Sequence, residues 1–329
     1  MATKIKKVEA KMKYEYSKGH LDKGDGIYFQ NMTWKQIEER LKVNDIIIIP
    51  VGSTEQHGRG QVTGEDGFLV TRMAEIVARE TGCTVSQPIW FGSHPWSQIG
   101  MPGTIVIPED IFVGYLRAVI AGYWNAGFRK MILLNGHGQE YVIPNAIQEF
   151  GKICQVPAVI TFLNWPTAIA KHLRDKSHGG PWETAFRHAD EVEASYSMAL
   201  FPELNHPEDF EDTEPKGFLP HGHIDLGGDV YQWPLPGHCT MGCGYLEIKG
   251  YPEGVVGKPS LADPKKAEEG LEALLDYFIK LHNDILEKFP PGVLPEPSCV
   301  TEQDRETIEA LLKGPHKGGK SLYAHRYPI

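Results

Sequence analysis

The sequence predicts an α/β fold in which a mainly parallel sheet is covered by helices on both faces. Residues 46–49 are four consecutive isoleucines, a pattern typical of a strand buried on both faces of a parallel sheet. Strand-like and helix-like apolar patterns then alternate along most of the chain. Polar residues follow the isoleucine run abruptly, as ligand-binding residues do beyond the carboxyl ends of strands. Together these patterns predict a three-layer αβα sandwich.

The elements of the first half are predicted from caps and apolar spacing. Thr33-Trp34-Lys35-Gln36 has the form of a capping box and should open a short helix before the isoleucine strand. Apolar residues at helical spacing predict a second helix after Asp66 that ends at Gly82, followed by a β-rich run at 84–89.

The second half repeats this alternation before it becomes irregular. The predicted segments are helix 110–126, strand 130–134, helix 142–152, strand 156–163 and, after the N-cap pair Asp263-Pro264, a long helix that ends near residue 289. Residues 201–259 are rich in Gly, Pro, His and aromatic residues, and we expect long loops near the site there. No linker divides the chain, so we expect one domain over 1–329 with a core of about 30–290, an N-terminal arm at 1–29 and a C-terminal tail at 291–329.

Composition excludes several classes of function. The formal net charge of −10 argues against binding to nucleic acid or to an anionic membrane, and no apolar run is long enough to span a membrane. Five cysteines are scattered through 329 residues, an odd number that predicts reduced thiols and a cytoplasmic protein.

Five residues that follow strands or lie in Gly-rich loops have the chemistry of metal ligands. Glu55, His57, Asp66, His137 and Glu183 supply three carboxylates and two imidazoles. Two divalent ions would leave one positive charge on this set, which a hydroxide nucleophile neutralises. Ligands of nitrogen and oxygen without thiolate favour Zn²⁺, with Mn²⁺ or Fe²⁺ as alternatives. Each residue taken alone could instead be a helix cap or a satisfied polar group at the edge of the core.

Three motifs in this order resemble the signatures of the creatininase family. They are Pro-Val-Gly-Ser-Thr-Glu-Gln-His-Gly at 50–58, Asn-Gly-His-Gly at 135–138 and His-Gly-Gly-x-x-Glu-Thr at 178–184. Met-Pro-Gly-Thr at 101–104 and Gly-Val-Val-Gly-Lys-Pro at 254–259 resemble two further elements of the family. The resemblance covers about 30–290 and implies a metal-dependent hydrolase with a three-layer αβα fold, a dinuclear centre and a hexameric assembly.

The resemblance also implies a role for each matching residue. Glu55 and His137 would hold one metal, His57 and Glu183 the other, Asp66 would bridge them, and His178 would transfer protons.

Two departures from the family pattern leave the ligand set open. Glu65 precedes Asp66 where relatives have threonine, so it competes as a ligand. Creatinine hydrolases place a glutamate ligand two residues after the central histidine, but here Gln139 and Glu140 occupy that region. We favour Glu183 as the carboxylate of the second metal and keep Glu140 as the alternative.

Other residues are candidates for binding substrate. They are Glu140, His94, Trp165 and Trp182, each of which could instead have a packing role. A separate zinc site is a further alternative for His221, His223, His238, Cys239 and Cys243.

We therefore expect a cytoplasmic, homo-oligomeric metal hydrolase that opens a small polar cyclic substrate through attack of a metal-bound hydroxide on a carbonyl. The extended N-terminus, the insertion at residues 201–259 and the Asn-Gly-His-Gly-Gln-Glu variant resemble one branch of the family. That branch cleaves a C–C bond in oxidised inositols such as 3-dehydro-scyllo-inosose, a step of inositol catabolism, and we prefer it. The alternatives are a cyclic amide or formamide hydrolase, which cleaves a C–N bond, and a metal-stabilised binding or assembly protein without turnover.

Overall fold

The computed structural model describes residues 21, 24, 26–215 and 246–329. Its centre is a four-stranded parallel sheet in the order β2-β1-β3-β4. The strands are β1 (Ile46–Val51), β2 (Thr84–Val85), β3 (Lys130–Asn135) and β4 (Val159–Asn164). The register pairs Val51 with Asn135 and Asn135 with Asn164, so three strands end at the same edge of the sheet.

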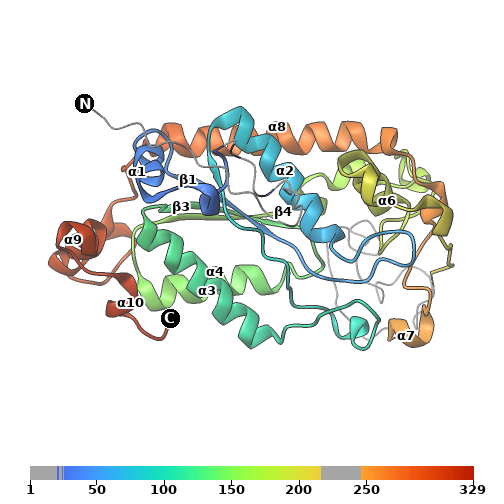
Figure 1. Cartoon of the computed structure of the whole chain (residues 1–329), viewed down its shortest axis with the longest axis horizontal. Helices are drawn as coiled ribbons and strands as arrows, with labels where there is room; N and C mark the ends of the chain where they lie inside the picture. Colours follow the sequence, from blue (N-terminus) through green and yellow to red (C-terminus); the bar gives the residue numbers. More distant parts are fainter. Residues whose placement is uncertain (1–20, 22–23, 25, 216–245) are drawn as a thin grey trace, which may run out of the picture.

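Helices cover both faces of this sheet, which confirms the predicted three-layer αβα class (Figure 1). One layer contains α2 (Glu65–Thr81), α6 (Glu191–Leu200) and α8 (Pro264–Lys288), and the other contains α3 (Glu109–Ala126) and α4 (Val142–Cys154). Ile46 and Ile48 pack into the first layer, whereas Ile47 and Ile49 pack into the second. The isoleucine run is continuous because both faces of β1 are buried.

The predicted caps are confirmed. Thr33 forms a capping box with Gln36 and opens α1 (Trp34–Val43). Gly82 and Gly127 end α2 and α3 in the left-handed conformation, which glycine adopts without a steric penalty. Asp263 caps α8 and is followed by proline at the first helical position.

The structure differs from the predicted elements in three places. The run at 84–89 forms a strand over only two residues, although Ile89 makes an isolated bridge to Val51. The short helix α7 (Glu247–Gly250) lies in the region predicted as loops, and the short helix α5 (Trp165–Ala168) was not predicted. Helix α6 was not predicted, although Asp190 caps it with hydrogen bonds from the amides of Val192 and Glu193.

The C-terminal tail extends the second layer. It contains α9 (Arg305–Lys313) and α10 (Leu322–His325), whose Ile308, Leu311 and Leu322 are buried against the cluster that includes α3 and α4. The predicted zinc alternative at residues 221–243 lies outside the described residues. No helix in the described ranges is both long and apolar enough to cross a membrane.

Candidate metal centre

Buried acidic and histidine side chains gather beyond the carboxyl ends of β1 and β3. Glu55 and His57 lie on the loop after β1, Asp66 on the first turn of α2, and His137 directly after β3. Glu193, on the first turn of α6, completes the cluster from the other side. Because parallel strands end at one edge, residues far apart in sequence meet there.

Direct contact between backbones sets the position of Asp66. A Cβ added to Gly52, after β1, would lie 2.4 Å from the Cα of Gly67, and one added to Gly136, after β3, would lie 2.3 Å from the carbonyl oxygen of Asp66. The amino end of α2 therefore rests against both strand ends, where any larger residue would push it away.

Glu55, Asp66 and His137 form one side of the cluster. His137 Nδ1 lies 2.7 Å from Glu55 Oε2 and 3.1 Å from Asp66 Oδ2, and Ser53 Oγ donates a 2.6 Å hydrogen bond to the same Asp66 oxygen. Burial opposes the ionised form of Glu55, but His137 and His188 outweigh it and hold the pKa of Glu55 well below its usual range. Burial likewise disfavours charged His137, yet Glu55 and Asp66 raise its pKa well above the usual value.

His57 forms the centre of the other side. Its Nδ1 donates a hydrogen bond of 3.1 Å to the carbonyl oxygen of Glu55, so its Nε2 carries no proton in the neutral ring. Three carboxylate oxygens surround Nε2, from Glu65 at 3.6 Å and from Asp66 and Glu193 at 3.7 Å each. These separations suit ligands of a common ion better than direct hydrogen bonds.

The acidic residues on this side are hard to ionise in the protein alone. Burial raises the pKa of Glu65 well above its usual value, and the charges of Asp66 and Glu55 raise it further. Burial also raises the pKa of Glu193 strongly, with Glu65 and Asp190 adding to the effect. Bound cations would offset this repulsion, since buried carboxylates need a partner of opposite charge.

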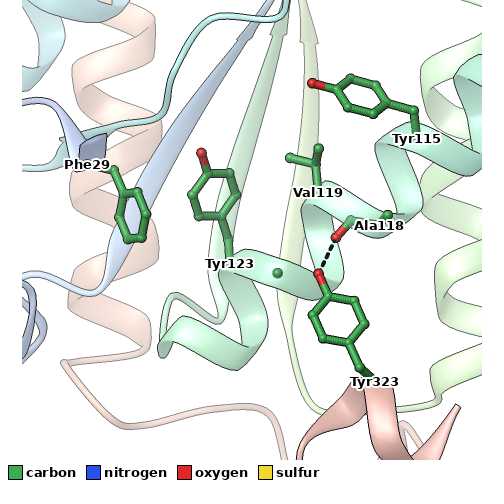
Figure 2. A pocket seen from close by; sticks show the side chains of 7 residues that line it. Phe29, Tyr115, Ala118, Val119, Tyr123 and Tyr323 are labelled. Carbon is green, nitrogen blue, oxygen red and sulfur yellow. Dashed lines mark hydrogen bonds between the residues drawn. The ribbon is translucent and has the colours of Figure 1, made fainter. Parts of the chain in front are cut away.

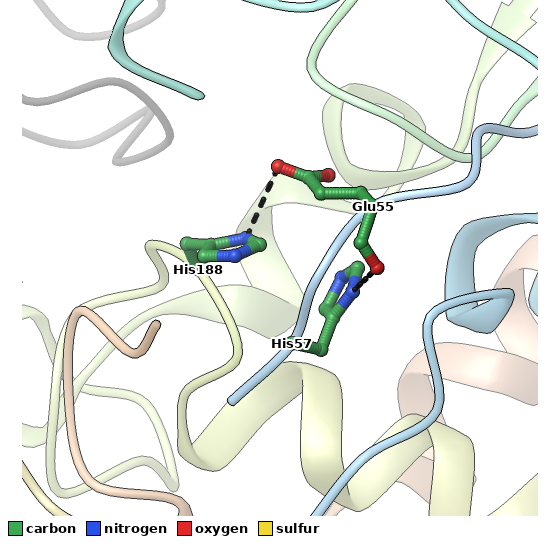
Figure 3. A group of neighbouring side chains, drawn as sticks. All are labelled: Glu55, His57 and His188. Carbon is green, nitrogen blue, oxygen red and sulfur yellow. Dashed lines mark hydrogen bonds and ion pairs between the residues drawn. The ribbon is translucent and has the colours of Figure 1, made fainter. Parts of the chain in front are cut away.

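His188 links the two sides (Figure 3). Its Nδ1 lies 3.8 Å from both Glu55 Oε1 and Glu193 Oε2, and its Nε2 donates to the carbonyl oxygen of Gln56 at 2.9 Å. Burial lowers the pKa of His188 to about 4, and the neighbouring His57 ring adds to this effect. His188 is therefore neutral at pH 7, with Nδ1 directed into the cluster.

The donor atoms fit divalent ions. Three groups in the cluster have ligand atoms within 4.8 Å of one another, namely Glu55 with His57 and the half-buried His188, Glu55 with His94 and His137, and His57 with Asp66 and Glu193. The Nε2 atoms of His57 and His137 are buried and have no hydrogen-bond partner among the described residues. Neutral imidazoles and carboxylates of this kind suit Zn²⁺ or Mn²⁺.

Four predicted ligands, Glu55, His57, Asp66 and His137, thus come together, but the fifth does not. The Glu183 carboxylate pairs with Lys176 at the surface, and its side chain is 41% exposed. His178 lies in the same turn, where its Nδ1 is 2.9 Å from Asp175 Oδ1. The segment folds on itself, because the amide of Gly180 donates to the Asp175 carbonyl and Trp182 forms a bridge with Asp175.

The missed residues repeat the predicted spacing. His188 and Glu193 are five positions apart, as are His178 and Glu183, and they lie ten residues further along the chain. Asp190, an N-cap residue followed by acidic residues, was the sequence signal that a helix begins there and carries Glu193 inward.

Two of the four candidate substrate-binding residues lie in the hydrophobic core instead. Trp165 packs against Tyr196 with ring centroids 4.9 Å apart, and Trp182 donates a 2.7 Å hydrogen bond from Nε1 to the carbonyl oxygen of His172. Both indoles are buried among the described residues and pack with the layer of α6 and α8. Glu140 is half-buried beyond His137 and belongs to none of the three ligand groups, whereas His94 belongs to one.

A further buried carboxyl group lies near the cluster. Glu247 accepts hydrogen bonds from Gln98 Nε2 at 2.6 Å and Gln56 Nε2 at 3.3 Å. Burial raises the pKa of Glu247 to about 8, and the charge of Glu55 adds to this effect. No sequence periodicity around residue 247 indicates this role.

Comparison with known proteins agrees with this geometry. The family model for creatinine amidohydrolases matches residues 30–282. The chain belongs to the creatininase family. The predicted resemblance is thereby confirmed, and the strand-end cluster lies within the matched residues.

Relatives within the family differ in the activity that their names describe. A protein from Thermotoga maritima named 3-dehydro-scyllo-inosose hydrolase is 58% identical over 304 residues, which are 92% of this chain and 98% of the relative. Creatinine amidohydrolase from Pseudomonas putida is 26% identical over 242 residues, covering 64% of this chain and 85% of the relative.

Solved structures of the family share the fold. A crystal structure of creatinine amidohydrolase superposes with a TM-score of 0.63 at 21% identity and covers 81% of this chain and 99% of its own. A structure described as creatininase with Mn gives a TM-score of 0.62 at 22% identity, with 80% and 99% coverage.

Proposed function

We propose that this protein is a divalent-metal-dependent hydrolase that opens the ring of an oxidised inositol of the 3-dehydro-scyllo-inosose type. The observation that carries the substrate is the 58% identity to the hydrolase of that name across 92% of this chain. The observation that supports metal chemistry is the buried cluster, in which Asp66 lies between His137 Nδ1 and His57 Nε2, and the latter has no hydrogen-bond partner among the described residues.

The proposed cofactors are two divalent ions, with Zn²⁺ ahead of Mn²⁺ or Fe²⁺. When bound, such ions lower the pKa of a water molecule to near 7 and polarise a carbonyl group. Asp66 is the proposed shared ligand because its Oδ1 faces His57 and its Oδ2 faces His137. Ser53 holds this carboxylate in place with its hydroxyl, a type of support that orients ligands in metal sites.

We assign proton transfer to His188, in place of His178. His188 Nε2 lies 2.9 Å from the Gln56 carbonyl oxygen and 3.0 Å from the Gln56 side-chain nitrogen. In the tautomer that donates to the carbonyl, Nδ1 is a proton acceptor 3.8 Å from the Glu55 and Glu193 carboxylates. In hydrolysis of a C–C bond next to two carbonyl groups, water adds to one carbonyl, the bond between that carbon and its neighbour breaks, and the neighbour leaves as an enolate. His188 would take the proton from the adding water and return it to this carbon.

The alternative within the family is hydrolysis of a cyclic amide, for which the 26% identical creatinine amidohydrolase is the relevant relative. The experiment is an assay of the purified protein on diketo-inositols, creatinine and formamides after loading with Zn²⁺ or Mn²⁺. We expect turnover of the diketo-inositol. Turnover restricted to amides would replace the proposed substrate, and metal binding without any turnover would favour the binding or assembly protein.

A matched pair of histidine variants tests the proton-transfer role. His188→Ala should lower kcat by about 10²–10⁴-fold, the usual contribution of a general acid or base, whereas His178→Ala should leave it near wild type. The reverse result would return the role to His178.

We also propose that the protein is cytoplasmic, as its scattered cysteines predict, and that it forms a homo-oligomer, as the family resemblance implies. Support for self-association comes from large apolar side chains that are more than half exposed in the single chain, including Phe91, Ile99 and Ile111. An open pocket of about 430 Å³ lies along α3. Its lining includes Tyr115 and the contacting rings of Phe29 and Tyr123, and Tyr323 donates to the Ala118 carbonyl at 2.9 Å (Figure 2). Light scattering of wild type and Ile111→Glu should show loss of the oligomer in the variant, and two monomeric samples would contradict self-association.

A further inference from the structure

We propose that His94 is a ligand of the ion that Glu55 and His137 hold. This inference rests on the metal centre of the proposed function and adds a ligand that lies outside the three family motifs. It makes the Glu55 side of the centre a site with two imidazoles.

The first argument is the state of the His94 ring. The residue is 2% exposed, and neither ring nitrogen makes a hydrogen bond of normal length and angle in the part of the chain that the structure describes. The Ile105 backbone interacts with the ring, but too weakly to offset burial, which lowers the pKa of His94 to about 4. A buried polar group without a partner is costly, and such groups in folded proteins are usually satisfied by protein, water or an ion. A metal ion would satisfy one of the two nitrogens of His94.

The second argument is distance. Ligand atoms of Glu55, His94 and His137 all lie within 4.8 Å of one another, and the two imidazole rings have centroids 4.4 Å apart. Metal–ligand bonds of about 2.0–2.2 Å place two ligands of one ion up to about 4.4 Å apart, so these three groups need little movement to share an ion.

The third argument is that the loop carrying His94 is fixed against the loop carrying His137. The amide of Ser93 donates to Gln139 Oε1 at 3.0 Å, and Gln139 Nε2 donates to the Gly52 carbonyl at 2.9 Å. The Gln139 side chain thereby ties the His94 loop to the ends of β1 and β3. A Cβ on Gly92 would lie 2.7 Å from Gln139 Oε1, so the loop approaches this amide as closely as glycine allows.

This ligand makes the two sides of the centre unequal. Glu55, His94 and His137 offer two nitrogens and a carboxylate, whereas His57, Asp66 and Glu193 offer one nitrogen and two carboxylates. Imidazole suits zinc, and carboxylate suits manganese and magnesium. We therefore expect the His94 side to retain zinc when the other side exchanges its ion.

The decisive experiment replaces His94 with a residue that reports on the ion directly. His94→Cys loaded with Co²⁺ should show thiolate-to-cobalt charge-transfer absorption that wild type lacks, because a thiolate at this position would bind the ion. His172→Cys is the matched control, since His172 pairs with Glu269 and belongs to none of the ligand groups found among the described residues. Absence of the band in His94→Cys that has bound Co²⁺ would overturn the inference.

A second variant gives an independent measurement. His94→Asn should lower the affinity for one zinc ion by more than the roughly 10–100-fold that loss of an outer partner costs, and leave the other ion bound. Thermal unfolding of the metal-free proteins checks that the variant folds. Two zinc ions held as tightly as in wild type, with only KM changed, would make His94 a substrate contact and overturn the inference. Wild type without bound metal would instead refute the proposed function itself.

Discussion

The two sides of the metal centre share Asp66 but are built differently. On the His137 side, the ligand atoms lie at hydrogen-bonding distances of 2.7 and 3.1 Å, and opposite charges stabilise Glu55 and His137. On the His57 side, carboxylate oxygens lie 3.6 to 3.7 Å from an imidazole nitrogen, and burial, with repulsion between the carboxylates, raises the pKa values of Glu65 and Glu193. One side can therefore be stable without an ion, whereas the other needs one to relieve its charge.

The largest expected effect comes from the residue that the two sides share. Asp66→Asn nearly preserves volume but removes the charge, so bound metal should fall from about two equivalents toward one or none, and activity should be lost. Metal analysis after dialysis measures this. Glu65→Gln is the control variant, and it should lose less metal than Asp66→Asn. If Asp66→Asn keeps both ions and Glu65→Gln loses them, Glu65 is the shared ligand instead.

The second-largest expected effect is the loss of metal from the His57 side of the centre alone. Glu193→Gln removes a carboxylate that lies 3.7 Å from His57 Nε2, so we expect loss of about one equivalent of metal while the His137 side keeps its ion. Glu183→Gln is a matched control with a surface carboxylate, and it should leave metal content unchanged. Equal losses in both variants would mean that Glu183 also contributes to the centre.

Acid should weaken metal binding, because protons compete with the ion for the groups whose pKa values are raised. In the metal-free protein Glu65, Glu193 and His137 hold their protons to higher pH than usual, and a binding ion must displace them. Affinity should therefore increase with pH through the range where these groups lose protons, and decrease in mild acid. Calorimetry in two buffers with different heats of ionisation should reveal net proton release. A pH-independent affinity with no proton release would show that the ligands are already deprotonated.

The smallest effect on the metal centre is expected from a substitution in the hydrophobic core behind it. Trp182→Phe removes the hydrogen bond to His172 and some buried volume, so we expect a stability loss of about 1–3 kcal/mol with unchanged metal content and KM. Denaturant unfolding and steady-state kinetics provide the two readouts. A changed KM with unchanged stability would restore Trp182 as a residue of the substrate pocket.

Sequence patterns predicted the sheet and the loop after β1 because both depend on local signals. The isoleucine run, the capping box at Thr33 and the glycine caps at Gly82 and Gly127 are each contained within a few residues. Glu55, His57 and His137 directly follow strands, so the direction of a parallel sheet is enough to bring them together.

Local sequence signals did not identify His188 and Glu193, which lie just before α6 and on its first turn. Two His and Glu pairs with the same spacing compete within residues 178–193, and only tertiary packing decides which one enters the cluster. Lys176 neutralises Glu183 at the surface, whereas Asp190 turns the chain so that Glu193 points inward. The buried Trp182 attracted a functional interpretation because sequence does not distinguish a core indole from one that lines a pocket.

The backbone contacts of Gly52 and Gly136 bear on how this enzyme family can diversify. Backbone atoms, and not side chains, set where α2 meets the ends of β1 and β3. The position of the Asp66 carboxylate relative to these strand ends is therefore insensitive to substitutions around it. Positions such as Gln98 and Glu247, whose side chains bond to each other and not to α2, can then vary while the Asp66 carboxylate keeps its place. Such substitutions would change the surroundings of the cluster without moving its shared carboxylate.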